Sequence, residues 1–299
     1  MLLLLLLSGC QSPPPAPEID GNAALAYART QVEFGPRVPG TEGHRKTSAW
    51  LDSLLRARAD TVVAQRWSHI SNAGDTLPLT NLLARFNPGA ERRIMFLAHW
   101  DTRPRADADS GAATNQPIDG ANDGASGVAV LLAMADALVK APPAVGVDLL
   151  FVDAEDYGTF PETDVLLGSK YFAANLPPGP KPEYAVLLDM VGAKGSIFRK
   201  EGFSVTAAPQ VVDMVWKIAA RMGHGRLFVD ETGISVTDDH IPLQQAGIRA
   251  IDVIAEFGRG YSFPYWHTAD DTIDKLSAEV LGAVGDVMMG VIRQAPRIK

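Results

Sequence analysis

Continuous apolar runs of strand length are the strongest constraint that this sequence places on its fold. Four such runs occupy residues 93–100, 147–156, 183–192 and 248–257. Segments with helical signals lie between and around them, at residues 22–34, 41–58, 124–140, 210–223 and 278–295. Strands that are buried on both faces need helices to cover them. The alternation therefore predicts a three-layer α/β/α fold with a mixed, mostly parallel central sheet.

Two weaker patterns precede the first apolar run. Residues 61–69 alternate between polar and apolar side chains, and residues 79–86 are also of strand type, so we expect a strand at each place. Thr41 opens the helix at 41–58 with the pattern of a capping box. His44 stands where Glu is usual, so the box is imperfect.

Length and charge narrow the class of protein. The chain has 299 residues, of which 46% are hydrophobic, and residues 21–299 suffice for one large domain with a substantial core. The net charge is −8, and no run of Lys or Arg offers a stripe of positive charge to a phosphate backbone. We therefore expect no nucleic acid partner.

Residues 1–20 are expected to be a signal and a tether rather than part of the fold. The Leu run at residues 2–7 is too short to span a bilayer and is typical of a secretion signal, although the usual basic region is missing. The letters LSGC resemble a bacterial lipobox, with Cys10 as the lipid attachment site, and a Pro-rich stretch follows. We expect an exported, membrane-anchored lipoprotein that faces the periplasm or the cell surface. A chance cysteine beside a Leu run is the alternative.

Polar side chains gather where the predicted strands end. They are His99, Asp101, Glu155, Asp156 and Asp189, with Asp123 at the start of the helix between the first two strands. Two later segments add Asp238, Asp239, His240, Trp266 and His267. Sites in folds of this class lie beyond the carboxyl ends of the strands, so this clustering predicts a functional site.

Each of these residues also has an ordinary structural role open to it. Asp123 could be a helix N-cap, Asp238 and Asp239 could begin a helix, and His240 could be a buried core histidine. Asp101 could either orient the ring of His99 or cap a strand end. Taken together, carboxylate and imidazole side chains suit a catalytic zinc site. Cys10 is the only cysteine, which excludes disulfides within the chain and a thiolate metal site.

A set of short motifs resembles one known group of enzymes. In chain order they are AHWD, GANDGASG, DAED, LLDMVG, DDHIP and WHTADD. The set resembles the zinc-dependent aminopeptidase and glutaminyl cyclase superfamily, from residue 34 to the last helix. The fold expected above is the fold of that superfamily.

The resemblance assigns roles by position. It makes Asp123, Asp156 and His267 the protein ligands of the main zinc, and Glu155 the general acid and base beside them. His99 and Asp189 correspond to ligands of a second zinc in the aminopeptidases, whereas the cyclases normally use one ion. We expect one zinc, with two as the alternative.

Further motifs favour the cyclase branch. The segment FGPRVPGT resembles the start of the cyclase domain, and DDHIP places Asp238 in a network with Glu155 and Asp189. Trp266 precedes the zinc histidine, where cyclases wall the substrate pocket with an indole, and His240 is a second candidate for substrate contact.

The expected activity is therefore conversion of an N-terminal Gln of peptides or proteins to pyroglutamate, with release of ammonia, by a monomer. A secreted aminopeptidase and a non-catalytic binding lipoprotein are the alternatives. The sequence departs from the common pattern in three ways, and the first is that residues 157–172 lack the Trp that animal cyclases have soon after the acid pair. Asp156 stands where Glu is common, and Asp252 stands where animal cyclases have His.

Overall fold

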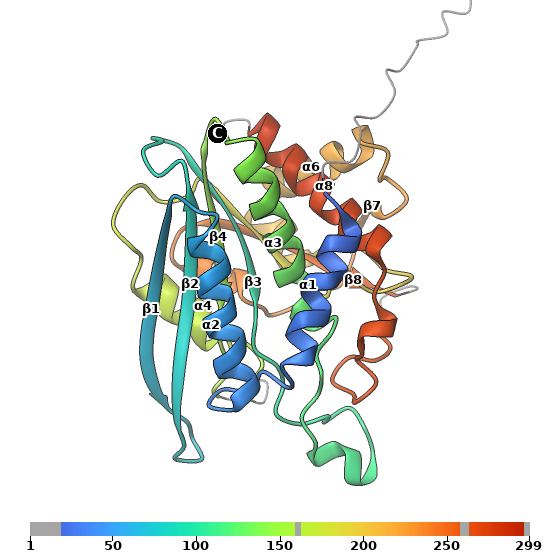
Figure 1. Cartoon of the computed structure of the whole chain (residues 1–299). Coiled ribbons are helices and arrows are strands. Elements are labelled where there is room, and N and C mark those ends of the chain that lie inside the picture. The colour runs from blue at the N-terminus through green and yellow to red at the C-terminus, as the bar shows by residue number, and fades with distance from the viewer. Residues whose placement is uncertain (1–18, 159–162, 258–262, 296–299) are drawn as a thin grey trace, which may run out of the picture.

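An eight-stranded sheet forms the centre of the computed structural model, which describes residues 19–158, 163–257 and 263–295 (Figure 1). The strand order is β1-β2-β4-β3-β5-β8-β6-β7. The strands are β1 (Thr61–Ile70), β2 (Thr76–Phe86), β3 (Arg93–His99), β4 (Gly146–Val152), β5 (Tyr184–Asp189), β6 (Ile197–Lys200), β7 (Phe228–Thr232) and β8 (Arg249–Glu256).

The middle of the sheet is parallel and its flanks are antiparallel. β4, β3, β5 and β8 run in one direction, while β2 pairs antiparallel with both β1 and β4. On the other flank, β6 pairs antiparallel with β8 and parallel with β7. The predicted mixed sheet is thus confirmed. The sequence pattern did not predict β6 and β7, because strands of four and five residues carry too few apolar positions to show a period.

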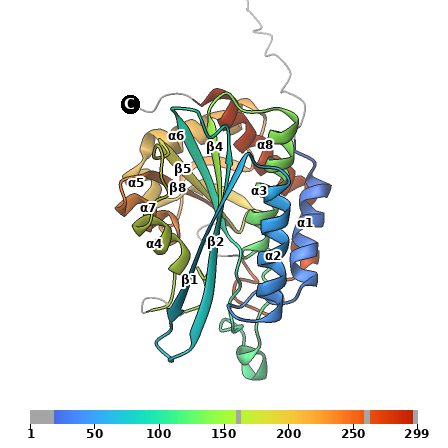
Figure 2. The ribbon, with the colours of Figure 1, turned by 60° about the vertical axis from the view of Figure 1, so that its left-hand side comes forward.

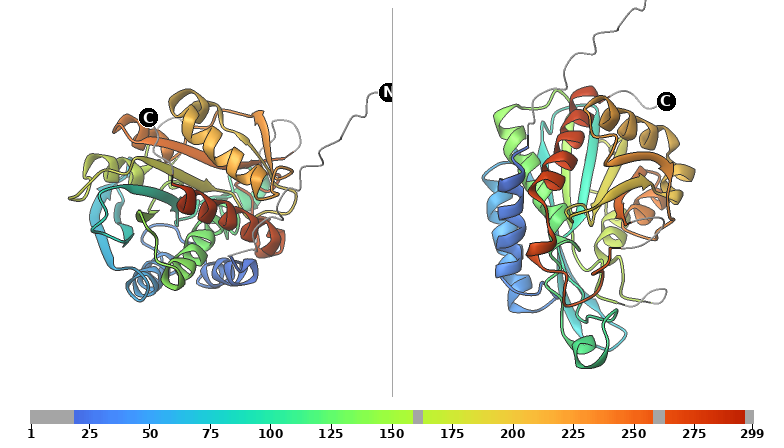
Figure 3. Two further views of the ribbon diagram at one scale, coloured as in Figure 1. Left: turned by 90° about the horizontal axis from the view of Figure 1, so that it is seen from above. Right: turned by 90° about the vertical axis from the view of Figure 1, so that its right-hand side faces the viewer.

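Helices cover both faces of the sheet. α1, α2, α3 and α8 lie on one side, and α4, α5 and α7 lie on the other (Figure 2). Figure 3 shows the same layers from above, and α6 packs against α8 and β8. The helices are α1 (Gly21–Glu33), α2 (Glu42–Arg56), α3 (Ala125–Lys140), α4 (Leu167–Ala174), α5 (Gly202–Ala207), α6 (Pro209–Arg221), α7 (His240–Gln245) and α8 (Ala278–Gln294).

The residues of β3 show why the central strands are apolar throughout. Ile94, Phe96 and Ala98 belong to the larger hydrophobic core, whereas Met95 and Leu97 belong to a second core on the opposite face. Side chains of a strand alternate between the two faces of a sheet, so a strand with helices on both sides must be apolar at every position. The continuous runs in the sequence follow from this double burial.

The start of α2 explains the imperfect capping box. Thr41 is the N-cap, and its side chain accepts a hydrogen bond from the backbone N–H of His44. The ring of His44 does not bond back to the cap. It stacks on Trp100, and its Nε2 lies 3.0 Å from a carboxylate oxygen of Asp153. His44 therefore ties α2 to the segment that follows β4.

The expected signal, the tether up to residue 18 and Cys10 lie outside the described residues. Within the described ranges, no helix is both long and apolar enough to cross a membrane.

Candidate metal centre and active site

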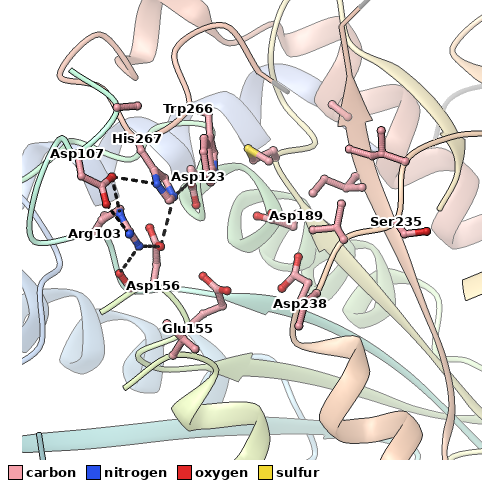
Figure 4. Close-up of a pocket in the computed structure, with 18 residues that line it drawn as sticks. Arg103, Asp107, Asp123, Glu155, Asp156, Asp189, Ser235, Asp238, Trp266 and His267 are labelled. Atoms are coloured by element: carbon pink, nitrogen blue, oxygen red, sulfur yellow. Dashed lines mark hydrogen bonds and ion pairs between the residues drawn. The ribbon is translucent and has the colours of Figure 1, made fainter. Parts of the chain in front are cut away.

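A cavity of about 650 Å³ opens beyond the carboxyl ends of the central strands (Figure 4). Its ionisable lining comes from Arg103, Asp107, Asp123, Glu155, Asp156, Asp189, Asp238 and His267. Its apolar walls are built by Val165, Met190, Ile234, Val236, Ile254, Ala255 and Trp266. The structure thus brings most of the predicted site residues to one place, although they come from distant parts of the chain.

The two adjacent acids after β4 are held by a third acid. Asp101 follows β3, and its two carboxylate oxygens accept hydrogen bonds from the backbone N–H groups of Glu155 and Asp156, at 3.0 and 3.1 Å. The same carboxylate lies 3.4 Å from Nδ1 of His99. Asp101 therefore anchors the end of the neighbouring strand, and it lies near the ring of His99, whose Nδ1 makes no hydrogen bond within the described residues.

Asp123, Asp156 and His267 form the first of two groups that could hold a metal ion. Their ligand atoms all lie within 4.8 Å of one another, and all three residues are buried. Nε2 of His267 lies 3.4 Å from Asp156 and 3.7 Å from Asp123. Oδ2 of Asp156 is buried and has no hydrogen-bond partner within the described ranges. Two carboxylates and an imidazole are ligands that zinc accepts, so these residues fit the ion that the sequence predicts.

The second group shares one residue with the first. Nε2 of His99 lies 3.1 Å from Asp123 and 3.2 Å from Asp189, and all three residues are buried. Asp123 therefore belongs to both groups. The geometry accommodates one metal or two.

Three of the carboxyl groups that face the cavity, those of Glu155, Asp189 and Asp238, are expected to carry fewer than three negative charges near neutral pH. Loss of hydration, together with the carboxylates of Asp156 and Asp238, raises the pKa of Glu155 well above its usual range. Burial beside Asp189 raises the pKa of Asp238 to about 7. Burial also raises the pKa of Asp189. Figure 4 shows Glu155, Asp189 and Asp238 around one space, so a proton can reside among them near neutral pH.

Arg103 and Asp107 are site residues that the sequence pattern did not reveal. Nη1 of Arg103 donates to Asp156 at 2.5 Å, and the rest of its guanidinium makes a two-pronged contact with Asp107. Asp107 in turn lies 3.1 Å from Nδ1 of His267. One ion pair thus contacts two of the candidate metal ligands. Its only sequence signal is an i,i+4 spacing of opposite charges, which is common on surfaces.

Trp266 and His240 have different surroundings. Trp266 lines the cavity, is 40% exposed, and stacks on His267 with 3.6 Å between the ring centres. His240 is fully buried at the start of α7, 3.4 Å from Glu201, and is not among the residues that line the cavity. This placement does not support the expected contact between His240 and a substrate, because surrounding side chains cover the ring completely. Asp239 and Asp252 are also fully buried.

Comparison with known proteins shows the family. Residues 81–292 match the model of peptidase family M28, and the chain therefore belongs to this family of enzymes. It is 27% identical over 271 residues to a glutaminyl-peptide cyclotransferase-like protein of Bos taurus. That match covers 79% of this chain and 66% of the bovine protein, so the chain spans just under two thirds of that relative.

Solved structures from both branches of the superfamily resemble this one. A glutaminyl cyclase of Bacteroides thetaiotaomicron bound to N-acetylhistamine is 39% identical, with a TM-score of 0.89, and the match covers 93% of this chain and 99% of that one. A leucine aminopeptidase precursor from the same species is 40% identical, with a TM-score of 0.88 and coverage of 94% and 99%. These similarities confirm the predicted fold. The two similar proteins carry the names of the two activities that the sequence left open, a glutaminyl cyclase and an aminopeptidase.

Proposed function

We propose that this protein is a zinc-dependent glutaminyl-peptide cyclotransferase. The observation that carries the proposal is the setting of Glu155. Its carboxyl group stands beside the candidate ligand Asp156, near Asp238, in a cavity with apolar walls and with Trp266 at its edge. Cyclisation needs a proton carrier and a pocket that keeps water out, and it consumes no water.

In this proposal Asp123, Asp156 and His267 hold one zinc ion. Bound there, zinc would supply Lewis-acid polarisation of the γ-carbonyl of the substrate's N-terminal glutamine. The buried, unpartnered Oδ2 of Asp156 supports this assignment, since a buried carboxylate oxygen without a partner is costly.

Glu155 carries the proton. The α-amine of the substrate attacks the γ-carbonyl carbon, and a new C–N bond closes the five-membered lactam. Glu155 takes a proton from the attacking nitrogen and delivers it to the departing amide nitrogen, whose bond to carbon breaks to release ammonia. Asp189 and Asp238 share a proton with Glu155 and so keep it able both to accept and to donate. Trp266 walls the pocket around the glutamine side chain.

A secreted aminopeptidase is the second candidate, and one observation favours it. His99, Asp123 and Asp189 form a second group with ligand geometry, as a two-metal hydrolase would require. The likeness to a leucine aminopeptidase precursor is also as strong as the likeness to the cyclases.

We also propose that the N-terminal segment anchors the catalytic domain to a membrane. Within residues 1–20, the part before Ile19 serves as a lipoprotein signal and a tether, and Cys10 carries the lipid. Ile19 and Asp20 already belong to the folded domain, because Ile19 is buried in the larger core and Asp20 is the N-cap of α1. Together with residues 21–299 they form the catalytic domain, which acts as a monomer on the N-termini of exported peptides and proteins. The membrane partner is reached through the lipid, and nucleic acid is not a partner.

Product analysis tests the activity. Protein without its first eighteen residues, which keeps the buried Ile19 and the N-cap Asp20, is loaded with zinc and given a short peptide that begins with Gln. Loss of ammonia from the peptide, absent in Glu155→Gln, is the expected result. Release of free glutamine, or of leucine from a peptide that begins with Leu, would instead establish an aminopeptidase.

A further inference from the structure

Arg37 is a buried cation that the proposed reaction does not use. It belongs to the segment FGPRVPGT, and none of its surface is exposed. Its guanidinium donates three hydrogen bonds to backbone carbonyl groups. Nε bonds to Trp100 at 3.0 Å, and Nη1 and Nη2 bond to Asp119 and Gly120 at 2.7 Å each. Trp100 directly follows His99, and residues 119 and 120 lead into Asp123.

Asp271 holds the same loop from its other side. Its carboxylate oxygens accept hydrogen bonds from the backbone N–H groups of Asn122 and Asp123, at 2.9 and 3.1 Å. Its own carbonyl accepts from the N–H of Ala121 at 3.2 Å. Asp271 is fully buried, and it lies four residues after His267 in the chain.

Together the two residues hydrogen-bond to the backbone of residues 119–123, the loop that ends at Asp123. Arg37 takes the carbonyl groups of residues 119 and 120, and Asp271 takes the N–H groups of residues 121–123. The backbone is tightly enclosed here. Gly120 has a φ of +57°, and a Cβ at that position would collide with the carbonyl oxygen of Asp123. The contacts also connect three segments that bear candidate ligands, namely 99–101, 119–123 and 267–271.

We infer that Arg37 and Asp271 are positioning residues that fix the Asp123 loop before metal binds. Ordering a loop residue costs about 1–2 kcal/mol, so a loop that is already ordered binds an ion more tightly than a free one. Loss of such outer partners typically weakens metal affinity by about 10- to 100-fold. The inference rests on the metal centre of the proposed function, and it holds for a cyclase and for an aminopeptidase alike.

The planar guanidinium is essential to this role. Three carbonyl oxygens in different directions need a fork of N–H donors, which Lys cannot supply although it keeps the charge. Arg37→Lys therefore tests the geometry separately from the charge. Asp271→Asn is the matching change on the other side. It keeps the size of the side chain and leaves only one oxygen to accept two N–H groups.

Arg93 is a matched control within the same molecule. Its side chain is 1% exposed, and it also donates to the carbonyl groups of a loop, those of Asn87 and Pro88. It lies at the opposite end of β3, far along the strand from His99. Arg93→Lys therefore removes the same kind of contact without touching a segment that bears a candidate ligand.

The experiment uses the full chain and measures two quantities for wild type, Arg37→Lys, Asp271→Asn and Arg93→Lys. Zinc affinity is measured by competition with a chromophoric chelator, and the melting temperature is measured on protein stripped of metal. We expect Arg37→Lys and Asp271→Asn to weaken zinc binding by about 10- to 100-fold and to alter the visible spectrum of the cobalt-substituted protein. Arg93→Lys should lower the melting temperature and leave the zinc affinity within about two-fold of wild type, because it touches no ligand segment.

The alternative results are distinguishable. Wild-type zinc affinity and an unchanged cobalt spectrum in both site variants would show that the two residues only stabilise the fold, and would overturn the inference. If Arg37→Lys does not fold, Asp271→Asn decides alone. A wild-type protein without measurable zinc affinity would overturn the metal centre itself and this inference with it.

Discussion

The two ends of strands β3 and β4 have opposite electrostatic characters. At the amino end, Arg93 of β3 is buried against Asp148 of β4, with 2.5 Å between Nη2 and the carboxylate, and both side chains are 1% exposed. At the carboxyl end, His99, Glu155 and Asp156 stand among further acids, and one buried oxygen of Asp156, Oδ2, lacks a hydrogen-bond partner within the described ranges. Charges at one end are paired for stability. Among the residues that line the cavity at the other end, acids outnumber cations, and our proposal gives these acids a metal ion to hold and a proton to carry.

The largest expected difference between the two ends concerns activity. Glu155→Gln should reduce kcat by about 10²- to 10⁴-fold, because the amide cannot accept and return a proton. It should not lower the melting temperature, since it removes a charge from a group of like charges. Turnover of an N-terminal Gln peptide and a thermal melt check both quantities. A large loss of stability would show that Glu155 supports the fold.

Asp148→Asn should have the opposite effect, a loss of stability without a loss of activity in the folded protein. It leaves the buried guanidinium of Arg93 without its counter-charge, and breaking a buried pair in this way costs about 3–5 kcal/mol. The free energy of unfolding in urea checks this. The zinc content and the turnover of the folded fraction should stay at the wild-type level. Loss of zinc in this variant would show that the two ends of the sheet are not independent.

Glu201 is a buried acid with hydrogen-bond partners, and it accepts one hydrogen bond from the backbone of Val236, which lines the cavity. Its contribution to stability should depend on pH. Although its burial opposes ionisation, the ring of His240 at 3.4 Å and hydrogen bonds from Ser204 and from backbone N–H groups hold the pKa of Glu201 at about 2. A carboxyl group with a lowered folded pKa stabilises the protein above its unfolded pKa of about 4.5, and this stability is lost as pH falls toward 2.

Glu201→Gln should therefore lower the free energy of unfolding by about 3 kcal/mol at pH 7, and the difference from wild type should shrink as pH falls below about 4.5. Urea unfolding at a series of pH values checks this. A difference that does not change between pH 7 and pH 3 would show that the ionised form of Glu201 has no special partners.

The smallest effect is expected at Trp266. The indole is 40% exposed and stacks on His267, so Trp266→Ala should change stability little. If the ring walls the glutamine side chain, the variant should lose about 1–3 kcal/mol of binding, seen mainly as a higher KM. Trp266→Phe should recover part of the loss. Unchanged kinetics in Trp266→Ala would place the substrate elsewhere in the cavity.

The sequence alone was sufficient to predict the features that show up as local patterns in the chain. The central strands were evident because double burial makes them continuously apolar, and the acids at their ends were evident because they interrupt those runs. β6 and β7 were too short to show a pattern. The sequence did not predict the ion pair between Arg103 and Asp156, or the hydrogen bonds from Arg37 to the loop that leads into Asp123. Both sets of contacts depend on how long loops fold back in space. His240 shows the opposite kind of failure. Its place in the motif DDHIP suggested contact with the substrate, but the ring is fully buried.

We propose that the acids gathered at the carboxyl end of the sheet, which outnumber the cations there, bind a metal ion. The most direct test is the zinc content of wild type, Asp156→Asn and Asp148→Asn after loading and removal of excess ion. We expect wild type and Asp148→Asn to retain about one zinc per chain, as a catalytic site with three protein ligands does, and Asp156→Asn to lose it. Full retention of zinc in Asp156→Asn, or its absence from wild type, would contradict the claim.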